Sequence, residues 1–220
     1  MRDFVVSVVQ IGGEKIVKEK ILEGASKLFF KYGVRSVTMD DVASYLAISK
    51  KTIYQFFKNK DDLITSISMA HMAEEKDEYL QIENVAGDAL EEMVQVSSCF
   101  RRHMNEINPK LLFELKKYHS VAWNVYVQFK TDFIKNHIKR NIERGISEGY
   151  YRDDLDPDIL STFRVEQVEL IFDDQIFPRE KYDFADVQMQ LFDHFMQGLL
   201  TDKGRALYSN YFKSIINSQA

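Results

Sequence analysis

Apolar residues recur at helical spacing along almost the whole chain, and this periodicity limits the possible folds more than any other feature of the sequence. Between Ile16 and Tyr32, for example, most apolar residues fall on one stripe of a helix. No Asn-Gly or Asp-Gly pair, the usual turn of a β-hairpin, separates alternating runs in the sequence. The pattern therefore predicts an all-α protein.

Capping residues and prolines predict where the helices begin and end. The first helix is expected over 14–32, because Gly33 can take the left-handed backbone of a C-terminal cap. Three capping signals start the next helices: Thr38 with Asp41, Ser49 before 50–56, and Asn59 with Asp62. With further boundaries at Asn108-Pro109, Asp156-Pro157 and Phe177-Pro178, later helices are expected over 84–106, 109–119, 121–148, 158–177, 184–201 and 203–217.

Composition points to a compact chain with its own core. The 220 residues are 45% hydrophobic and 29% charged, with three prolines and nine glycines. The single cysteine excludes a disulfide framework and fits a reducing compartment. No apolar run approaches the ~20 residues that span a bilayer, and the segment from Phe4 to Val9 lacks the features of an export signal. We expect a cytoplasmic protein without a membrane partner.

Charge is divided unevenly along the chain. Residues 14–60 hold ten Lys and Arg against five Asp and Glu, a net charge of +5, whereas residues 61–220 hold 18 against 28, a net charge of −10. A local basic patch can attract phosphate even when the net charge of the whole chain is −5. This division is a hint of nucleic-acid contact near the N-terminus.

Residues 38–57 have the spacing of a helix-turn-helix, in which the second helix enters the major groove of DNA. Val42, Leu46, Ile48 and Ile53 are apolar where the two helices must pack, and Phe56 is expected in the same core. Ala47 stands where glycine is usual, which would cost about 1 kcal/mol for a positive φ. The competing interpretation is an αα-hairpin with a solvated lysine face.

The exposed positions of this motif carry side chains that suit DNA. Lysine contacts phosphate or guanine, glutamine can bind an adenine edge with two hydrogen bonds, and Thr or Tyr hydroxyls donate to phosphate. The residues of this kind between the packing positions are Lys50, Lys51, Thr52, Tyr54 and Gln55.

The wider pattern resembles the N-terminal domain of the tetracycline-repressor (TetR) family of bacterial regulators. It comprises Ile21, Ala25, Leu28-Phe29, Tyr32-Gly33, Thr38, Val42-Ala43, Ile48-Ser49 and the run from Thr52 to Leu63, and Glu148 to Arg152 with Asp156-Pro157 is a fainter match. The resemblance implies that Thr38, Tyr54, Lys58 and Lys60 hold phosphates, that Lys50, Lys51, Thr52 and Gln55 face bases, and that Ser49 lies with them.

The resemblance also implies a homodimer built from the last long helices. Val187, Leu191, Phe195 and Leu199 form an i, i+4 ridge, and Phe163 with its apolar neighbours, such as Ile159, could supply the facing helix. Two-fold symmetry would match a palindromic operator on double-stranded DNA.

Aromatic residues are dense in the larger, C-terminal part of the chain. Most of them must fill the core, but some could line a cavity for a small hydrophobic molecule. The candidates for binding such an effector are Phe100, His103, Met104, Trp123 and Tyr126.

The sequence supports catalysis or metal binding less well than it supports DNA binding. Gly145 to Gly149 matches the G-x-S-x-G nucleophile elbow, but that turn needs a preceding strand, and residues 133–144 have helical spacing. Glu166, Glu169 and Asp173 share a helical face that is better explained as solvated. Cys99 has no local signature and the histidines show no paired spacing, so we expect an inert thiol, no metal site, no cofactor and no catalytic residue.

The sequence thus predicts a ligand-responsive transcriptional regulator rather than an enzyme. Its expected parts are an extension over 1–13, a three-helix DNA-binding domain over 14–60, and a larger helical effector-binding and dimerisation domain over 61–220. A repressor released from its operator by a hydrophobic effector is the preferred form. An activator or nucleoid-associated protein with the same DNA-binding domain, or a helical interaction module that binds no DNA, remains an alternative.

Overall fold

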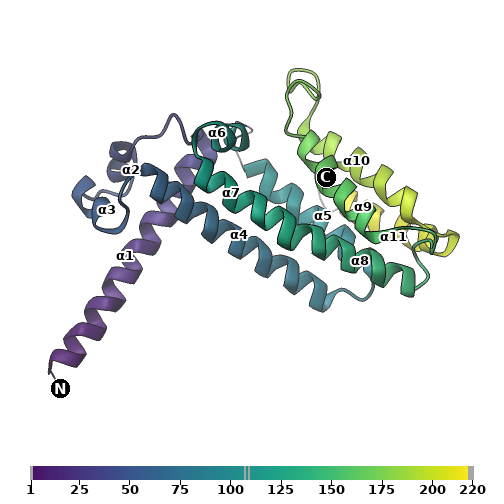
Figure 1. Cartoon of the computed structure of the whole chain (residues 1–220), viewed down its shortest axis with the longest axis horizontal. Helices are drawn as coiled ribbons and strands as arrows, with labels where there is room; N and C mark the ends of the chain where they lie inside the picture. Colours follow the sequence, from purple (N-terminus) through teal and green to yellow (C-terminus); the bar gives the residue numbers. More distant parts are fainter. Residues whose placement is uncertain (1, 107, 109, 218–220) are drawn as a thin grey trace. The chain divides into compact units, whose positions relative to one another are not determined.

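The computed structural model describes residues 2–106, 108 and 110–217, with side chains over 14–104, 108 and 110–212. Its elements in chain order, labelled in Figure 1 where there is room, are α1 (Arg2–Tyr32), α2 (Met39–Tyr45), α3 (Lys50–Phe56), α4 (Lys60–Val85), α5 (Ala89–Glu106), α6 (Leu111–Tyr118), α7 (Ser120–Gln128), the π-helical segment η1 (Phe129–Ile134), α8 (Lys135–Ser147), α9 (Pro157–Leu170), α10 (Phe184–Leu199) and α11 (Asp202–Asn217). Within these ranges the β-structure is limited to an isolated bridge between Tyr151 and Leu200. The all-α prediction is confirmed.

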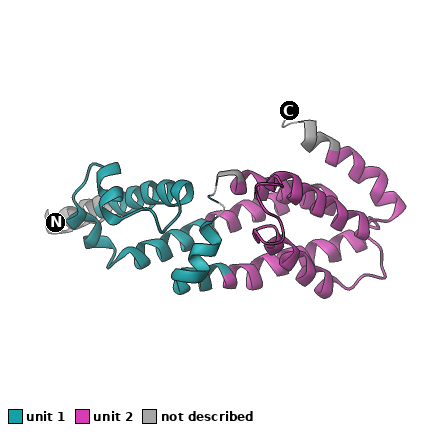
Figure 2. Ribbon diagram, turned by 90° about the horizontal axis from the view of Figure 1, so that it is seen from above, with its two compact units in different colours: residues 1–73, 106–126 teal, residues 74–105, 127–220 magenta. Residues whose placement is uncertain are grey.

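The chain forms two compact units, coloured in Figure 2. The first comprises Met1–Ala73 and Glu106–Tyr126, and the second comprises Glu74–Asn105 and Val127–Ala220. The helix α4 therefore contributes residues to both. The division of the sequence at residues 13 and 60 stays a prediction about function, and the side chains of the extension 1–13 lie outside the described residues.

The first unit is built on the apolar stripe of α1. Ile21, Ala25 and Phe29 of that stripe are buried, and apolar residues of every neighbouring helix pack around them. They include Val42 of α2, Ile53 of α3, Leu63 of α4, Leu111 and Leu115 of α6, and Ala122 of α7. The short helices α2 and α3 are thus held by a shared core, because helices of seven residues are marginal by themselves.

The predicted caps that bound the early helices are present. Thr38 Oγ1 accepts a hydrogen bond from the Asp41 N–H at 3.2 Å, and Asp41 Oδ2 accepts one from the Thr38 N–H at 2.8 Å. Ser49 Oγ accepts the Thr52 N–H at 3.0 Å, which starts α3. Gly33 ends α1 with φ at +84°, as its capping role requires. These local bonds fix the ends of the helices that matter for the site.

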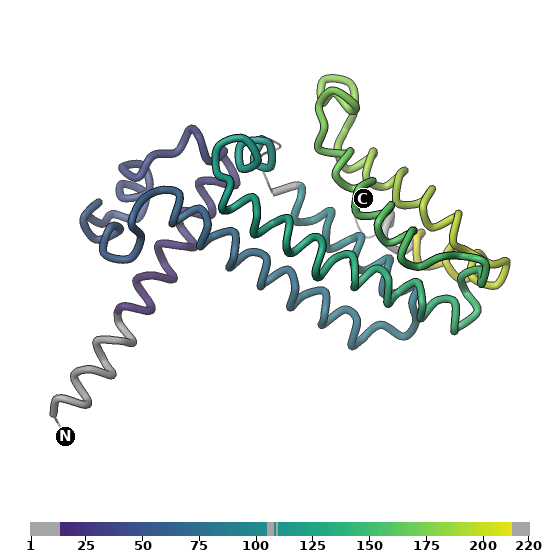
Figure 3. Tube along the Cα trace, viewed as in Figure 1, coloured from purple at the N-terminus to yellow at the C-terminus, as the bar shows by residue number. Residues whose placement is uncertain are grey.

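The second unit has a separate core between α5, α8, α9, α10 and α11. Its largest fully buried side chains include Tyr151, Tyr208 and Phe192. The Tyr151 hydroxyl donates to Asn141 Oδ1 at 3.1 Å, so its one polar atom is satisfied inside the core. Helix α9 contacts both α8 and α10, which can be followed along the trace in Figure 3.

Three expected helix boundaries are wrong. The first helix, expected over 14–32, begins at Arg2. Helix α5 begins at Ala89 rather than 84, because Asp88 caps it by accepting the Glu91 N–H at 2.8 Å. The expected helix over 121–148 is present as one uninterrupted helical stretch from Ser120 to Ser147, in which the π-helical segment η1 joins α7 to α8. Helix α9 ends at Leu170 rather than 177, since the N–H groups from Ile171 to Asp173 bond three residues back and tighten the chain into turns. Pro109, expected to start a helix, lies outside the described residues.

None of the described helices combines the length and the apolarity that crossing a bilayer requires.

Candidate nucleic-acid interface

The helices α2 and α3 form the predicted helix-turn-helix. Ala47 occupies the turn with φ at +53°, the conformation that the sequence analysis expected of this position. The Ile48 N–H donates to the Ala43 carbonyl at 3.0 Å and closes the turn. Val42 and Ile53, both fully buried, join the two helices to the core below. The backbone of α3 is therefore fixed from one side and free on the other.

The free side of α3 presents a continuous polar face. Lys51, Tyr54 and Gln55 are spaced at i, i+3 and i+4 on α3, Lys58 follows just beyond the end of the helix, and all four side chains are exposed. They combine two cations, a phenol and a carboxamide, which are the donor types that contact phosphates and base edges. This face can bind a nucleic acid without any change in the core.

Four other predicted contacts already have partners at the ends of the helices. Lys50 Nζ lies 3.0 Å from Asp40 Oδ2, and this hydrogen bond raises the pKa of Lys50. Thr38 Oγ1 donates to Asp41 Oδ2 at 2.7 Å. Ser49 Oγ lies 2.8 Å from Thr52 Oγ1, so these two hydroxyls share a bond. The Thr38 hydroxyl must release Asp41 before it can donate to a phosphate, whereas the Lys50 ammonium has three donors and can keep Asp40 while it contacts DNA.

Lys60 differs from the other predicted phosphate ligands because it is half-buried. Its ammonium lies over the Phe29 ring, 5.8 Å from the centroid, and burial lowers its pKa. Phe56 is half-buried against the core, and the next residue, Phe57, is fully buried. The expectation that Phe56 belongs to the core rather than to the free face agrees with this placement.

Two residues near this face were missed by the sequence analysis. Tyr45, in the last turn of α2, is 55% exposed and adds a second phenol beside the turn. Asp40 holds Lys50 from the preceding helix. An exposed tyrosine at the end of α2 could have been found from its position opposite the apolar stripe, but the Asp40–Lys50 pair spans ten residues and depends on how α2 and α3 cross.

The structure does not gather the five predicted effector ligands within one unit. Phe100, His103 and Met104 belong to the second unit, whereas Trp123 and Tyr126 belong to the first. Trp123 and Tyr126 pack against each other with ring centroids 5.1 Å apart. Phe100 packs edge-on against Phe172 at 6.4 Å, and His103 Nε2 lies 3.2 Å from Glu78 Oε2. Their role in ligand binding stays a prediction.

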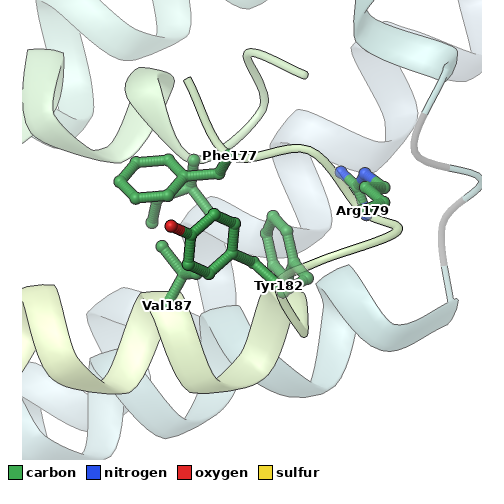
Figure 4. A pocket seen from close by; sticks show the side chains of 6 residues that line it. Phe177, Arg179, Tyr182 and Val187 are labelled. Carbon is green, nitrogen blue, oxygen red and sulfur yellow. The ribbon is translucent and has the colours of Figure 1, made fainter. Parts of the chain in front are cut away.

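A small pocket lies in the second unit between the end of α9 and the start of α10 (Figure 4). It is lined by Ile171, Phe177, Arg179, Tyr182, Phe184 and Val187, and its empty volume is about 170 Å³. Much of this volume is open to solvent, and the enclosed part has essentially no room for a water-sized molecule, whereas sites for small molecules usually measure about 300–1,000 Å³. None of the five predicted effector ligands lines it.

The predicted dimer residues differ in how much surface they offer. Val187, Phe195 and Leu199 are buried within the chain, and Leu191 is half-buried. Phe163 is 53% exposed, and on the same face of α9 Ile159 is 65% and Leu170 45% exposed. Of the two helices with predicted dimer residues, α9 therefore offers more apolar surface than the buried ridge of α10.

The G-x-S-x-G segment has a structural role as the end of α8. Ser147 Oγ donates to the Arg144 carbonyl at 2.8 Å, and Gly145 lies directly against the ring of Tyr151. A helix, rather than a strand, precedes the serine. The arrangement lacks the strand-turn-helix context of a nucleophile elbow, as the sequence analysis expected.

Comparison with known proteins links this face to transcriptional regulators. The family profile described as bacterial regulatory proteins, tetR family, matches residues 21–67, which include α2 and α3. The HTH-type transcriptional regulator YhgD of Bacillus subtilis (strain 168) is 29% identical over 160 residues, covering 71% of this chain and 83% of that protein.

Two solved structures share the fold over most of the chain. A transcriptional regulator from Saccharomonospora viridis in complex with choline has a TM-score of 0.71 at 18% identity, covering 85% of this chain and 99% of its own. The regulator FadR from Bacillus subtilis in complex with stearoyl-CoA has a TM-score of 0.65 at 16% identity, covering 82% and 98%. At these identities the likeness establishes the fold alone.

Proposed function

Because this chain belongs to the tetR family of bacterial regulatory proteins, we propose that it represses transcription as a homodimer on a palindromic operator and leaves DNA when a hydrophobic effector binds. It is a transcriptional regulator of TetR type and not an enzyme. Beyond the family assignment, we propose four things: that the protein represses transcription, that it acts as a homodimer, that its effector is hydrophobic, and that it acts in the cytoplasm.

The observation that carries the proposal is the polar face of α3. Lys51, Tyr54 and Gln55 project from a helix whose opposite side is anchored by the fully buried Ile53, and the exposed Lys58 lies just beyond the end of that helix. A rigid helix can hold a side chain in register with a base edge, because little conformational freedom is lost on binding. We assign base contacts to Lys51, Gln55, Thr52 and Lys50, and phosphate contacts to Thr38, Ser49, Tyr54, Lys58 and Lys60.

The effector would bind in the second unit, where polar groups are buried among apolar side chains. Gln188 is fully buried and its Nε2 donates to Ser97 Oγ at 2.9 Å, while its Oε1 has no hydrogen-bond partner among the described residues. Arg164 is also buried, and its guanidinium lies over the rings of Phe192 and Phe195. A few buried polar groups in apolar walls are typical of sites that select small molecules. The relative FadR, which binds stearoyl-CoA, supports a hydrophobic effector.

DNA binding is tested with the tightest duplex selected from a randomised pool and with a scrambled duplex. Gln55→Ala and Lys51→Ala should each cost about 1–3 kcal/mol on the selected duplex and little on the scrambled one. Lys58→Ala should weaken both and reduce the salt slope by about one unit. The exposed Lys181 of the second unit provides the control Lys181→Ala, which should change neither. Equal losses on both duplexes for Gln55→Ala would contradict base reading by α3.

The direction of regulation and the effector need separate measurements. A reporter gene behind the selected operator should be silenced by the protein, whereas activation would overturn the repressor assignment. Hydrophobic metabolites, stearoyl-CoA among them, are then titrated against the protein–DNA complex. An effector that prefers the unbound conformer should lower DNA affinity about 5- to 150-fold, and by linkage DNA should weaken effector binding equally. Binding that is indifferent to DNA would reject this coupling.

A further inference from the structure

Three side chains with different metal-ligating atoms meet in the second unit. Cys99 and His103 lie one turn apart on the same face of α5, and Glu78 faces them from α4. Cys99 Sγ lies 2.9 Å from Glu78 Oε2, and His103 Nε2 lies 3.2 Å from the same oxygen. All three candidate ligand atoms fall within 4.8 Å of one another. The sequence analysis treated Cys99 as isolated and so missed the Cys-x₃-His spacing on one helix.

This set of donors matches the preferences of zinc. Thiolate sulfur, imidazole nitrogen and carboxylate oxygen bind Zn²⁺ at about 2.0–2.3 Å in tetrahedral geometry. Ligand atoms around such an ion are therefore about 3.5 Å apart. The two measured separations, 2.9 and 3.2 Å, are close to this value, and small side-chain rotations would bring the atoms to it. Hard cations such as Mg²⁺ prefer oxygen ligands alone and fit the set poorly.

Without a metal ion the thiol of Cys99 keeps its proton, so a cation must displace that proton to bind the sulfur. Cys99 is buried, and burial together with the carboxylate of Glu78 raises its pKa to about 12. Burial also raises the pKa of Glu75, which is close enough to interact with both His103 and Glu78. A bound metal ion reverses this situation, because it stabilises the thiolate and the carboxylates together.

We propose that Glu78, Cys99 and His103 bind a borderline-soft divalent cation of the Zn²⁺ class, with Glu75 or water as the fourth ligand. The site joins α4 to α5 within the second unit. It is independent of the proposed function, since it requires neither DNA binding nor a hydrophobic effector. Its occupation would commit His103 to the metal rather than to an organic effector.

Cobalt provides a direct probe of the thiolate ligand. The reduced full chain, freed of metal with a chelator, is titrated with Co²⁺ and followed by absorption. A thiolate bound to Co²⁺ gives a sulfur-to-metal charge-transfer band, and tetrahedral coordination gives intense ligand-field bands. We expect both to saturate at one Co²⁺ per chain and to disappear when Zn²⁺ is added. Absence of the charge-transfer band would overturn the proposal.

Substitutions distinguish the loss of a single metal ligand from a general effect on the fold. Cys99→Ser should abolish the charge-transfer band, and Glu78→Gln and His103→Gln should each weaken Co²⁺ binding by more than about 100-fold, since even loss of an outer-shell partner costs about 10–100-fold. His194, an exposed histidine of α10, provides the control His194→Gln, which should bind Co²⁺ like the unaltered chain.

Metal-dependent stabilisation gives a second readout of the site. Each variant is first checked by circular dichroism without metal, and Zn²⁺ should then raise the thermal midpoint of the unaltered chain and of His194→Gln but not of a folded Glu78→Gln. Equal Co²⁺ affinity in the unaltered chain and in Glu78→Gln would show that these groups form a hydrogen-bond cluster only. An equal Zn²⁺ shift of the thermal midpoint in both proteins would also overturn the metal site.

Discussion

At the scale of single residues, Ala47 shows a local conformational cost inside the DNA-binding motif. Its φ of +53° lies in the left-handed region, where an L-residue with a Cβ is strained by about 1–2 kcal/mol. The turn is nevertheless held, because the Ile48 and Ala47 N–H groups are bonded back to α2. The motif therefore tolerates alanine at a position where glycine would fit without strain.

Replacing this residue should consequently stabilise the protein. We expect Ala47→Gly to raise the free energy of unfolding by up to about 1 kcal/mol, since relief of strain exceeds the added entropy of the unfolded chain. Ala47→Val should lower it by more than about 1 kcal/mol, because a β-branched residue is a stronger outlier at positive φ. The exposed Ala73 of α4 is the matched control, and Ala73→Gly should cost about 0.5–1 kcal/mol. Urea denaturation measures all three, and a destabilising Ala47→Gly would contradict the strain argument.

His137 is a second residue whose environment sets a measurable property. Its ring is buried, with Nδ1 3.1 Å from Glu83 Oε2 and Nε2 3.5 Å from Glu92 Oε1. Burial lowers the pKa of His137 below 6.5, and this effect outweighs the attraction of Glu83. The folded state therefore holds this imidazole neutral where the unfolded state would already bind a proton.

The consequence is a loss of stability in mild acid. The contribution of His137 is complete above pH 6.5 and falls as the pH drops below that value, by about 1.4 kcal/mol for each unit of pKa depression. Urea denaturation at pH 7.5 and 5.5 should show a smaller pH effect for His137→Gln than for the unaltered chain. The exposed His194 offers the control His194→Gln, which should keep the full effect. Identical pH dependence in His137→Gln and the unaltered chain would rule out this residue as the source.

At the scale of elements, the end of α8 depends on a close contact. A Cβ on Gly145 would overlap Cδ2 and Cε2 of the Tyr151 ring, which is itself buried and bonded to Asn141. We expect Gly145→Ala to lower the free energy of unfolding by about 1–3 kcal/mol, because the ring cannot move without disturbing the core. Thermal and urea unfolding measure this change. Ser147→Ala, in the same motif but exposed, should have little effect, and a Gly145→Ala protein of full stability would show that the ring has room to shift.

The same elements show which parts of the structure a sequence can predict. Thr38, Ser49 and Asn59 are capping residues that act within four positions of themselves, so their roles could be deduced from local spacing. The π-helical segment η1 between α7 and α8 could not, since its Lys130 contacts Glu166 and Glu169 of α9, far along the chain. These contacts also correct the expectation of a purely solvated acidic face.

In the candidate site, too, some features could be predicted from the sequence and others could not. The free face of α3 could be predicted because helical spacing alone separates Lys51 and Gln55 from the buried Ile53. The partner of Lys50 and the grouping of Glu78 with Cys99 could not, because each pair joins two helices whose crossing is set by the packed core. Contacts of that kind need the tertiary structure.

At the scale of the whole molecule, the basic N-terminal region and the acidic remainder of the chain favour different contacts. The net charge of +5 over 14–60 suits phosphate, whereas the −10 over 61–220 would repel DNA from most of the surface. One recognition helix reads only a few bases, so specific binding benefits from a second copy. Two copies related by a two-fold axis would place their recognition helices about 34–36 Å apart on one face of the duplex.

The exposed side of α9 is the surface that such a dimer would use. Ile159, Phe163 and Leu170 form a ridge on it, while Arg164 and Val165 on its other side are buried in the chain. We expect Phe163→Asp to convert a dimer into a monomer, because a charge at the centre of an apolar interface loses its hydration. Light scattering at micromolar concentration measures the mass, and operator affinity should fall with it. Phe113, equally exposed on α6, provides the control Phe113→Asp, which should stay dimeric. A dimeric Phe163→Asp protein, or a monomeric unaltered chain that binds the operator at full strength, would exclude α9 as the interface.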